Sequence, residues 1–165
     1  MGRAASNLVA LVAVLFAVVT VALAGAGGYL YWERVQTRAE IQTRETLPRL
    51  ATQQLPLIFG YDYQTVERSL DDAARLLTDD YKVEFEDRAS KDIIPQARER
   101  QLVSQANVVG AGMLDAHRNS GSVMVFLNRT VTDKSKQPVY DGSRLRVDYE
   151  KNARGEWKIK YITPI

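Results

Sequence analysis

The sequence predicts a membrane-anchored α+β protein: a transmembrane helix, a helical stalk, then helices packed on a four-stranded antiparallel sheet. Three observations support this. Residues 4–32 carry no charge. Residues 66–93 repeat apolar side chains at helical spacing, and residues beyond 101 alternate apolar and polar side chains as strands do. Because the helices precede the strands, we expect them to cover one face of a curved sheet, which gives an α+β cone.

Composition limits the functional classes. The chain has 165 residues, enough for one domain beside an anchor, and a net charge of +2. A charge so close to neutral argues against nucleic acid as a partner, which usually requires a clustered basic face. The sequence has no cysteine. That excludes disulfides, cysteine nucleophiles, thiolate metal sites and a lipoprotein cysteine.

Residues 8–32 are predicted to form the transmembrane helix. As a helix this run is about 37 Å long, against about 30 Å of hydrocarbon in a bilayer. Tyr29, Tyr31 and Trp32 lie at its C-terminal end, where aromatic rings settle at the membrane interface. Residues 22–24, ALA, also fit a signal-peptidase site. The apolar run continues beyond them, which favours a retained anchor over a cleaved signal peptide.

The orientation follows from the lengths on either side of the anchor. A short tail ahead of a long C-terminal domain is typical of a signal-anchor, although the flanking charges barely discriminate between the two orientations. We therefore expect residues 1–7 in the cytoplasm and residues 59–165 outside it, at the plasma membrane.

Residues 33–58 are predicted to form a polar helical stalk between the anchor and the domain. The stretch ERVQTRAEIQTRETLPR, residues 33–49, has good helix formers and few apolar residues. Such a pattern is typical of a solvent-bridging helix. Pro48 and Pro56 are expected to kink or interrupt it.

Two apolar stripes predict the helices of the domain. They consist of Val66, Leu70, Ala73, Ala74 and Leu77, and of Tyr81, Phe85, Ala89 and Ile93. Pro95 then ends the second helix or begins a short new one. The many acids between these positions indicate a solvated helical face, because no loop here has the ligand spacing of an EF-hand.

Four strands are expected, over residues 102–114, 123–132, 144–150 and 157–161. In the last two, apolar residues alternate with charged ones, which indicates one buried and one wet face. The connections DAHRNSG, DKSKQP and NARG are turn-like, so the strands should form an antiparallel meander. Gly110 and Gly112 predict a bulge or bend in the first strand.

No motif for catalysis stands out. His117 is the only histidine, and an exposed residue in a hairpin turn is its simplest interpretation; alone, it argues against a zinc site. A cone can house an enzyme if acids and tyrosines face an apolar interior, and the candidates are Asp62, Tyr63, Tyr81 and Tyr149. A general acid needs burial beside a specific partner, which no pattern here indicates. We expect no enzymatic activity, no metal and no cofactor.

Two blocks carry a family resemblance, GYDYQTVERSLDDAARLLTDDYKVEF and DGSRLRVDYEKNARGEWKIKYITPI. Their motif residues are Tyr61, Asp62 and Tyr63 opening a helix, Asp141, Gly142, Ser143 and Arg144 entering a strand, and Trp157 in the last strand. With the position of the anchor, these blocks make the chain similar to the actinobacterial Mce-associated membrane proteins, which are accessory proteins of the mammalian-cell-entry lipid transport systems. From the residues alone, Asp141 and Gly142 suit a turn or bulge, and Trp157 suits the core.

The resemblance implies a domain similar to nuclear transport factor 2 and a non-catalytic accessory or scaffold role in a complex that imports lipid or sterol. Protein subunits of that complex would be the partners, with lipid as a further possibility. The resemblance assigns no catalytic residue. Two other hypotheses stay open: a carrier whose cone holds a small ligand such as a lipid, and an assembly factor of a type IV secretion system, which shares the domain type.

Overall fold

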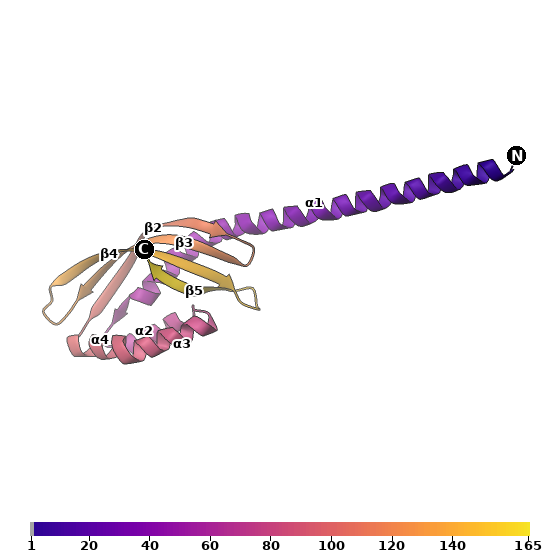
Figure 1. The fold of residues 1–165 in the computed structure, drawn as a ribbon. Coiled ribbons are helices and arrows are strands. Elements are labelled where there is room, and N and C mark those ends of the chain that lie inside the picture. The colour runs from indigo at the N-terminus through magenta and orange to yellow at the C-terminus, as the bar shows by residue number, and fades with distance from the viewer. Residues whose placement is uncertain (1) are drawn as a thin grey trace. The chain divides into compact units, whose positions relative to one another are not determined.

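The computed structural model describes the backbone of residues 2–165 and the side chains of residues 16, 20–23, 35 and 37–165. The chain divides into two compact units, Met1–Ala39 and Glu40–Ile165, which we describe separately. Helix α1 (Gly2–Phe59) contributes to both. Figure 1 shows the order of the elements along the chain.

The predicted tail and anchor fall within the first unit. The side chains of Tyr29, Tyr31 and Trp32, and most of those in residues 1–32, lie outside the described residues. Within the described part of the chain, no helix combines the length and the apolar character needed to cross a bilayer. The anchor over residues 8–32 and its aromatic edge stay predictions.

The second unit begins with residues 40–59 of α1, which contribute to the core. Leu47, Ala51 and Leu55 are fully buried and Ile58 is nearly so. The structure differs here from the polar stalk expected over residues 33–58. The reason is that apolar residues spaced four apart form one stripe, and one stripe suffices to bury a helix face while the other faces stay polar.

Helix α1 also continues through Pro48 and Pro56, where the sequence predicts a kink or an interruption. Thr52 Oγ1 donates a hydrogen bond to the Pro48 carbonyl at 2.9 Å. Packing of the surrounding apolar stripe outweighs the roughly 3 kcal/mol by which proline disfavours a helix interior. The helix ends where Gly60 N–H donates to the Pro56 carbonyl. A Cβ at Gly60 would lie 2.5 Å from that carbonyl oxygen, so this close approach requires glycine.

Four helical segments follow. They are α2 (Val66–Ala74), α3 (Asp79–Arg88), a π-helical turn (Ala89–Ile93) and α4 (Ile94–Arg100). Both predicted stripes are buried except for the partly exposed Ile93. Pro95 lies in the first turn of α4, so it begins a new helix, one of the two predicted possibilities. Leu77 lies beyond α2 and forms a parallel bridge with Ile159.

The sheet has five antiparallel strands in the order β1-β2-β3-β4-β5. They are β1 (Tyr61–Asp62), β2 (Val103–Ala116), β3 (Ser120–Thr132), β4 (Pro138–Lys151) and β5 (Trp157–Pro164). The four predicted strands are present, and the prediction missed β1. Tyr61 and Asp62 pair with Ser104 and Val103 instead of opening a helix, which starts only at Val66. A two-residue strand has no periodicity from which to predict it.

Two local features of the strands test the glycine predictions. The register of β2 against β3 shifts between Val108 and Gly110, so the predicted bulge is present. Asp141 and Gly142 lie inside β4, opposite Arg129 and Asn128, so the predicted turn or bulge there is wrong. The turn between β3 and β4 lies over residues 133–137, within the predicted turn DKSKQP, and β4 is longer than predicted because its first half is solvent-exposed yet fully paired.

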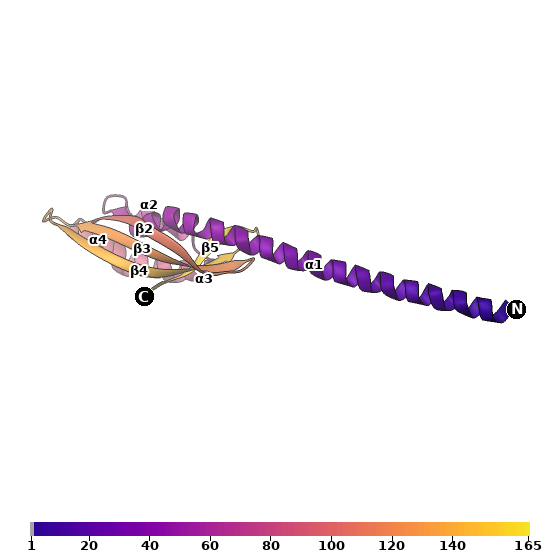
Figure 2. The same ribbon diagram turned by 90° about the horizontal axis from the view of Figure 1, so that it is seen from above.

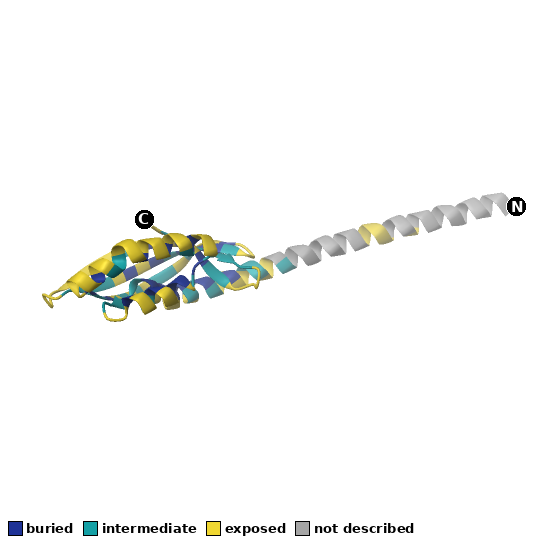
Figure 3. Ribbon diagram, turned by 90° about the horizontal axis from the view of Figure 1, so that it is seen from below, coloured by how far each residue is buried: buried dark blue, intermediate teal, exposed yellow. Residues whose placement is uncertain are grey.

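The core lies between the inner face of the sheet and the helices (Figures 1 and 3). The inner face consists of alternate residues of the central strands. These include Val123, Val125, Leu127, Leu145, Val147 and Tyr149, and Ile159 of the edge strand β5 is buried with them. Residues 40–59 of α1 approach the sheet closely, because a Cβ on Gly121 would lie 2.6 Å from Leu47 Cδ1. The outer face carries no helix where Figure 2 looks onto β3 and β4.

Candidate functional site

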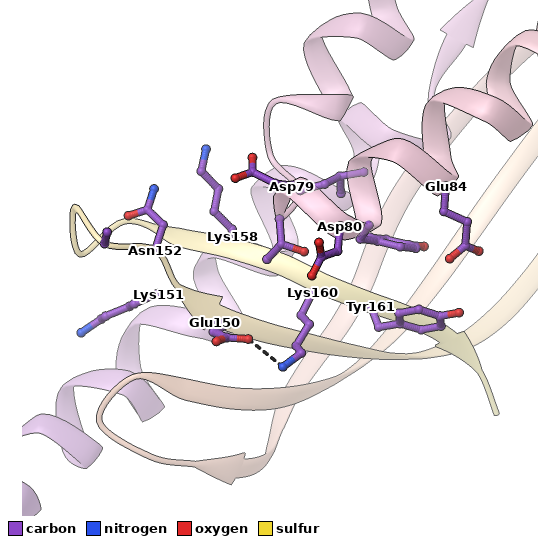
Figure 4. Close-up of a pocket in the computed structure, with 13 residues that line it drawn as sticks. Asp79, Asp80, Glu84, Glu150, Lys151, Asn152, Lys158, Lys160 and Tyr161 are labelled. Carbon is purple, nitrogen blue, oxygen red and sulfur yellow. Dashed lines mark ion pairs between the residues drawn. The ribbon is translucent and has the colours of Figure 1, made fainter.

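A polar groove lies between the start of α3 and the hairpin that joins β4 to β5 (Figure 4). Its volume is about 630 Å³. The charged residues that line it are Asp79, Asp80, Glu84, Glu150, Lys151, Lys158 and Lys160. The α3 wall is therefore acidic, and the hairpin wall carries three lysines and one acid, around one depression that is open to solvent.

Backbone pairing fixes the two walls of this groove. Thr78 N–H donates to the Ile159 carbonyl at 2.9 Å, and Ile159 N–H donates to the Leu76 carbonyl at 2.9 Å. Thr78 is the extended residue before α3, and Asp79 and Asp80 occupy the first turn. Carboxylates in that position interact favourably with the helix dipole. The start of α3 is thus tied to β5 with its acids at the rim.

A tyrosine pair lies at one end of the groove. The rings of Tyr81 and Tyr161 have centroids 4.9 Å apart and planes tilted by 31°. The Ile162 backbone N–H donates to the Tyr81 hydroxyl. Burial raises the pKa of Tyr81 above its ordinary value, with the Arg88 charge opposing the shift. Tyr81 therefore stays protonated at neutral pH, and its hydroxyl serves to hold β5.

The three lysines of the groove each have a partner. Lys160 Nζ lies 2.7 Å from Glu150 Oε2, and this hydrogen bond raises the pKa of Lys160. Lys158 Nζ donates to the Arg75 carbonyl at 2.7 Å. Lys151 Nζ lies 4.7 Å from the centroid of the Trp157 ring, a cation–π contact. An open groove of mixed charge suits contact with a polar protein surface better than enclosure of an apolar ligand.

The four residues considered as catalytic candidates play separate roles. Asp62 Oδ1 accepts a hydrogen bond from Gln64 N–H at 2.8 Å, and the Tyr63 hydroxyl accepts one from Gln64 Nε2 at 3.1 Å. Tyr149 lies in the core, 1% exposed, and its hydroxyl has no partner among the described residues. Burial raises the pKa of Tyr149. No hydrogen bond between described residues joins any two of Asp62, Tyr63, Tyr81 and Tyr149.

The residues of the family motif hold the strands in place. Tyr61 is half-buried against the core, and burial raises its pKa. Asp141 Oδ2 lies 3.1 Å from an Arg129 guanidinium nitrogen and accepts a hydrogen bond from Ser143 Oγ at 3.4 Å. The Arg144 carbonyl accepts a bond from Ile165 N–H at 3.0 Å.

Trp157 and His117 lie near the ends of the sheet. Trp157, predicted for the core, is only partly buried and packs at its margin beneath Lys151. His117 is exposed between β2 and β3, as predicted, with Nε2 2.9 Å from Asp115 Oδ2. Its backbone N–H donates to the Ser120 carbonyl at 2.8 Å.

The groove itself was not predicted from the sequence. Its two walls come from residues 77–84 and 150–161, which are distant in sequence and meet only in the folded domain. The strand pattern does place Lys158 and Lys160 on a wet face. A register shift of β4 against β5 beside Tyr149 then reorders the side chains at this edge, and no local signal in the sequence marks that shift.

No protein-family model matches the chain. It is 27% identical over 144 residues to the outer membrane protein Rv1973 of Mycobacterium tuberculosis, an alignment that covers 87% of this chain and 89% of that protein. It is 28% identical over 146 residues to the uncharacterized protein Rv1362c of the same species, covering 86% of this chain and 65% of that protein.

Solved structures share the fold. An IcmL-like type IV secretion system protein from Legionella pneumophila superposes with a TM-score of 0.63 at 9% identity, over 74% of this chain and 93% of that one. The periplasmic domain of DotI gives 0.62 at 13%, over 73% and 94%. CagV, a VirB8 homologue from Helicobacter pylori, gives 0.58 at 10%, over 72% and 95%. The chain therefore has the α+β fold of these domains, a curled five-stranded antiparallel sheet packed against helices.

Proposed function

We propose that this protein is a non-catalytic accessory subunit that assembles or stabilises a multi-subunit complex of the cell envelope. The domain over residues 40–165 would lie outside the cytoplasm, held at the membrane by the predicted anchor over residues 8–32. It would act through contacts with other protein subunits.

One observation carries the proposal. The inner face of the sheet, where a carrier or an enzyme of this shape would bind its ligand, is packed by the domain's own side chains. Leu47 and Leu55 of α1 and Tyr149 of β4 are fully buried there in one continuous apolar cluster. What the domain offers to other molecules is its outside: an open groove of mixed charge and the rim of its sheet. Surfaces of this kind suit protein contacts.

The comparisons support an envelope role without defining it. One relative, similar over most of both chains, is named an outer membrane protein. The structural neighbours are an IcmL-like component of a type IV secretion system, the periplasmic domain of DotI and a VirB8 homologue. A shared fold alone does not transfer a function, so these names support the class of role and not the identity of the complex.

Our first candidate for the complex is a lipid or sterol importer of the mammalian-cell-entry type. The motif residues of the two resembling blocks support it, as does the mycobacterial source of the two relatives, since the resemblance is to an actinobacterial family. A type IV secretion-like machine is the second candidate, and the fold shared with the secretion-system domains favours it. Both candidates require protein partners and neither requires catalysis.

Affinity capture of the full chain tests the proposal. The tagged protein, cross-linked in native membranes, should recover the permease and substrate-binding subunits of an importer. Recovery of secretion-machine subunits would instead select the second candidate. The groove variant Lys160→Glu should lower the yield, and the matched variant Lys91→Glu should not, since Lys91 pairs with Asp87 within one helical run away from the groove. Recovery of no envelope complex would contradict the proposal.

Lipid binding is checked on the same preparation. Mass spectrometry of the purified full chain should find no lipid bound in a fixed ratio. Added lipids should not raise the unfolding temperature of the domain. A stoichiometric lipid, or a clear thermal shift, would favour the carrier hypothesis.

A further inference from the structure

We propose that the outer edge of β2, over residues 105–111, is a docking site for an extended, uncharged segment of a partner protein, which would add a strand to the sheet. This inference rests on the proposed function, because it names the kind of partner segment that the accessory domain would hold. It joins two observations at the same place, unpaired backbone and an adjacent pocket.

The first observation is that β2 is an unfinished edge. The two-residue strand β1 pairs only with Val103 and Ser104. Beyond them, no described residue pairs with the outer side of residues 105–111. In an edge strand about half of the backbone N–H and C=O groups point away from the sheet. On either side of the bulge at Val109, these groups are available to an incoming strand.

The far end of β2 is not part of this site. There Thr43 Oγ1 of α1 donates to the carbonyl of His117 at 2.9 Å, which brings α1 beside the turn between β2 and β3 (Figure 2). The open stretch therefore begins where β1 ends and stops short of that turn, which leaves room for a short segment only.

The second observation is a pocket at the start of the open stretch. It has a volume of about 450 Å³, and Pro56, Leu57, Leu76 and Ala106 form its apolar part. Leu57 is 58% exposed. An added strand that begins at this pocket and runs along β2 would place one of its side chains in the pocket. Main-chain bonds supply affinity in this mode of recognition, and side-chain pockets supply specificity.

Charge and side-chain pattern define the occupant. Residues 102–114 contain no charged side chain, and Asp72, an acid that lines the pocket, lies 3.6 Å from a guanidinium nitrogen of Arg75, so no side chain along the strand can pair with a charged segment. The inner-face residues Ala106, Val108 and Ala111 are only partly buried, whereas their counterparts on β3, such as Val125, are fully buried. Alternate apolar side chains of an added strand would extend the core over them. The partner segment is therefore extended, uncharged and apolar at every second residue.

A display library of short peptides, panned against the solubilised full chain, tests the inference. Selected peptides should be uncharged with apolar residues at alternate positions. N-methylation on one set of alternate backbone nitrogens should weaken binding of a selected peptide at least tenfold. N-methylation on the other set should weaken binding little. Only pairing through the main chain predicts that asymmetry.

Matched variants locate the site. Leu57→Asp in the pocket and Val109→Lys on the edge should each weaken binding of the selected peptide at least tenfold. Val83→Asp, at an exposed position of α3 away from β2, should leave it unchanged. All three replace exposed side chains, so circular dichroism should show the same fold in each.

Several results would overturn the proposal. They are the absence of enriched peptides, charged or helical winners, no effect of N-methylation, and equal effects of Leu57→Asp and Val83→Asp. Self-association lost in Val109→Lys would replace the partner by a second copy of the chain. Peptide binding by a chain that captures no envelope complex would leave this inference standing and remove the proposed function.

Discussion

The two edges of the sheet are finished in different ways. At β5, the backbone of Ile159 pairs with residues 76–78, and the Ile162 N–H donates to the Tyr81 hydroxyl. Pro164, the last residue of β5, has no N–H to offer. These are devices by which proteins prevent further pairing along an edge strand.

At β2 the corresponding devices are sparse. Among the described residues, β1 covers two positions and α1 contacts both ends of the strand, while bulges at Val109 and Leu114 interrupt it. No proline and no charge lies between residues 102 and 114. The contrast teaches that one edge of this domain is built to stay closed, and it places the surface for the partner segment that we propose at the other.

Ile159→Ala is expected to have the largest effect on the free energy of unfolding, because Ile159 ties the closed edge at β5 to residues 76–78. Ile159 is fully buried, and truncation of such a side chain to alanine lowers the free energy of unfolding by about 2–5 kcal/mol. Val109→Ala on the open edge removes an exposed side chain and should change it by less than about 0.5 kcal/mol. Chemical denaturation of the solubilised full chain measures both, and equal effects would contradict the difference between the edges.

The interior between the edges is tested by pH. Burial raises the pKa of Tyr149 above its ordinary value of 10.0, so above pH 10 the unfolded state loses a proton that the native state keeps. Stability should therefore fall as pH rises beyond 10, by up to about 1.4 kcal/mol per pH unit from this group. Denaturation at pH 9 to 11 should show a shallower decline in Tyr149→Phe. An identical slope would refute the assignment.

A smaller loss is expected when the closed edge is partly opened. Tyr81→Phe keeps the ring against Tyr161 but removes the oxygen that accepts the Ile162 N–H. Loss of one such hydrogen bond lowers the free energy of unfolding by about 0.5–1.5 kcal/mol. Hydrogen exchange at Ile162 should accelerate while exchange in β2 stays as it is. Unchanged exchange at Ile162 would show that this tyrosine does not close the edge.

The smallest effect on stability is expected in the groove beside β5. Lys160 and Glu150 form an exposed ion pair, and such pairs contribute little to folding. Lys160→Glu should leave the denaturation midpoint unchanged while lowering the capture of partner subunits. A loss of stability in this variant would show that the Lys160–Glu150 pair stabilises the fold and does not serve as a contact surface.

The sequence predicts the parts of this fold that repeat. Alternation in β4 and β5 and the stripes from Val66 to Ile93 identify the strands and helices, because burial on one face imposes a period. Short or one-sided features escape the same reasoning. The stripe of Leu47, Ala51 and Leu55 is hidden among polar residues, and β1 is too short to show a period. Asp141 and Gly142 have the composition of a turn, but pairing with β3 holds them in a strand.

The candidate surfaces are harder to predict than the fold. The groove joins Asp79 and Asp80 to Lys160, and the pocket beside β2 joins Leu57 to Ala106. These residues are distant in sequence, so only the tertiary structure brings them together. The absence of charge around β2 was visible in the sequence, but its meaning depends on knowing that β2 lies at an edge.

Residue-resolved hydrogen exchange of the solubilised full chain tests the central contrast most directly. The account predicts that Ile159 and Ile162 exchange slowly, and that the outward-pointing amides among residues 105–111 exchange quickly and become protected when a selected peptide is added. Slow exchange along the whole outer edge of β2 in the isolated chain, matching that of β5, would contradict it.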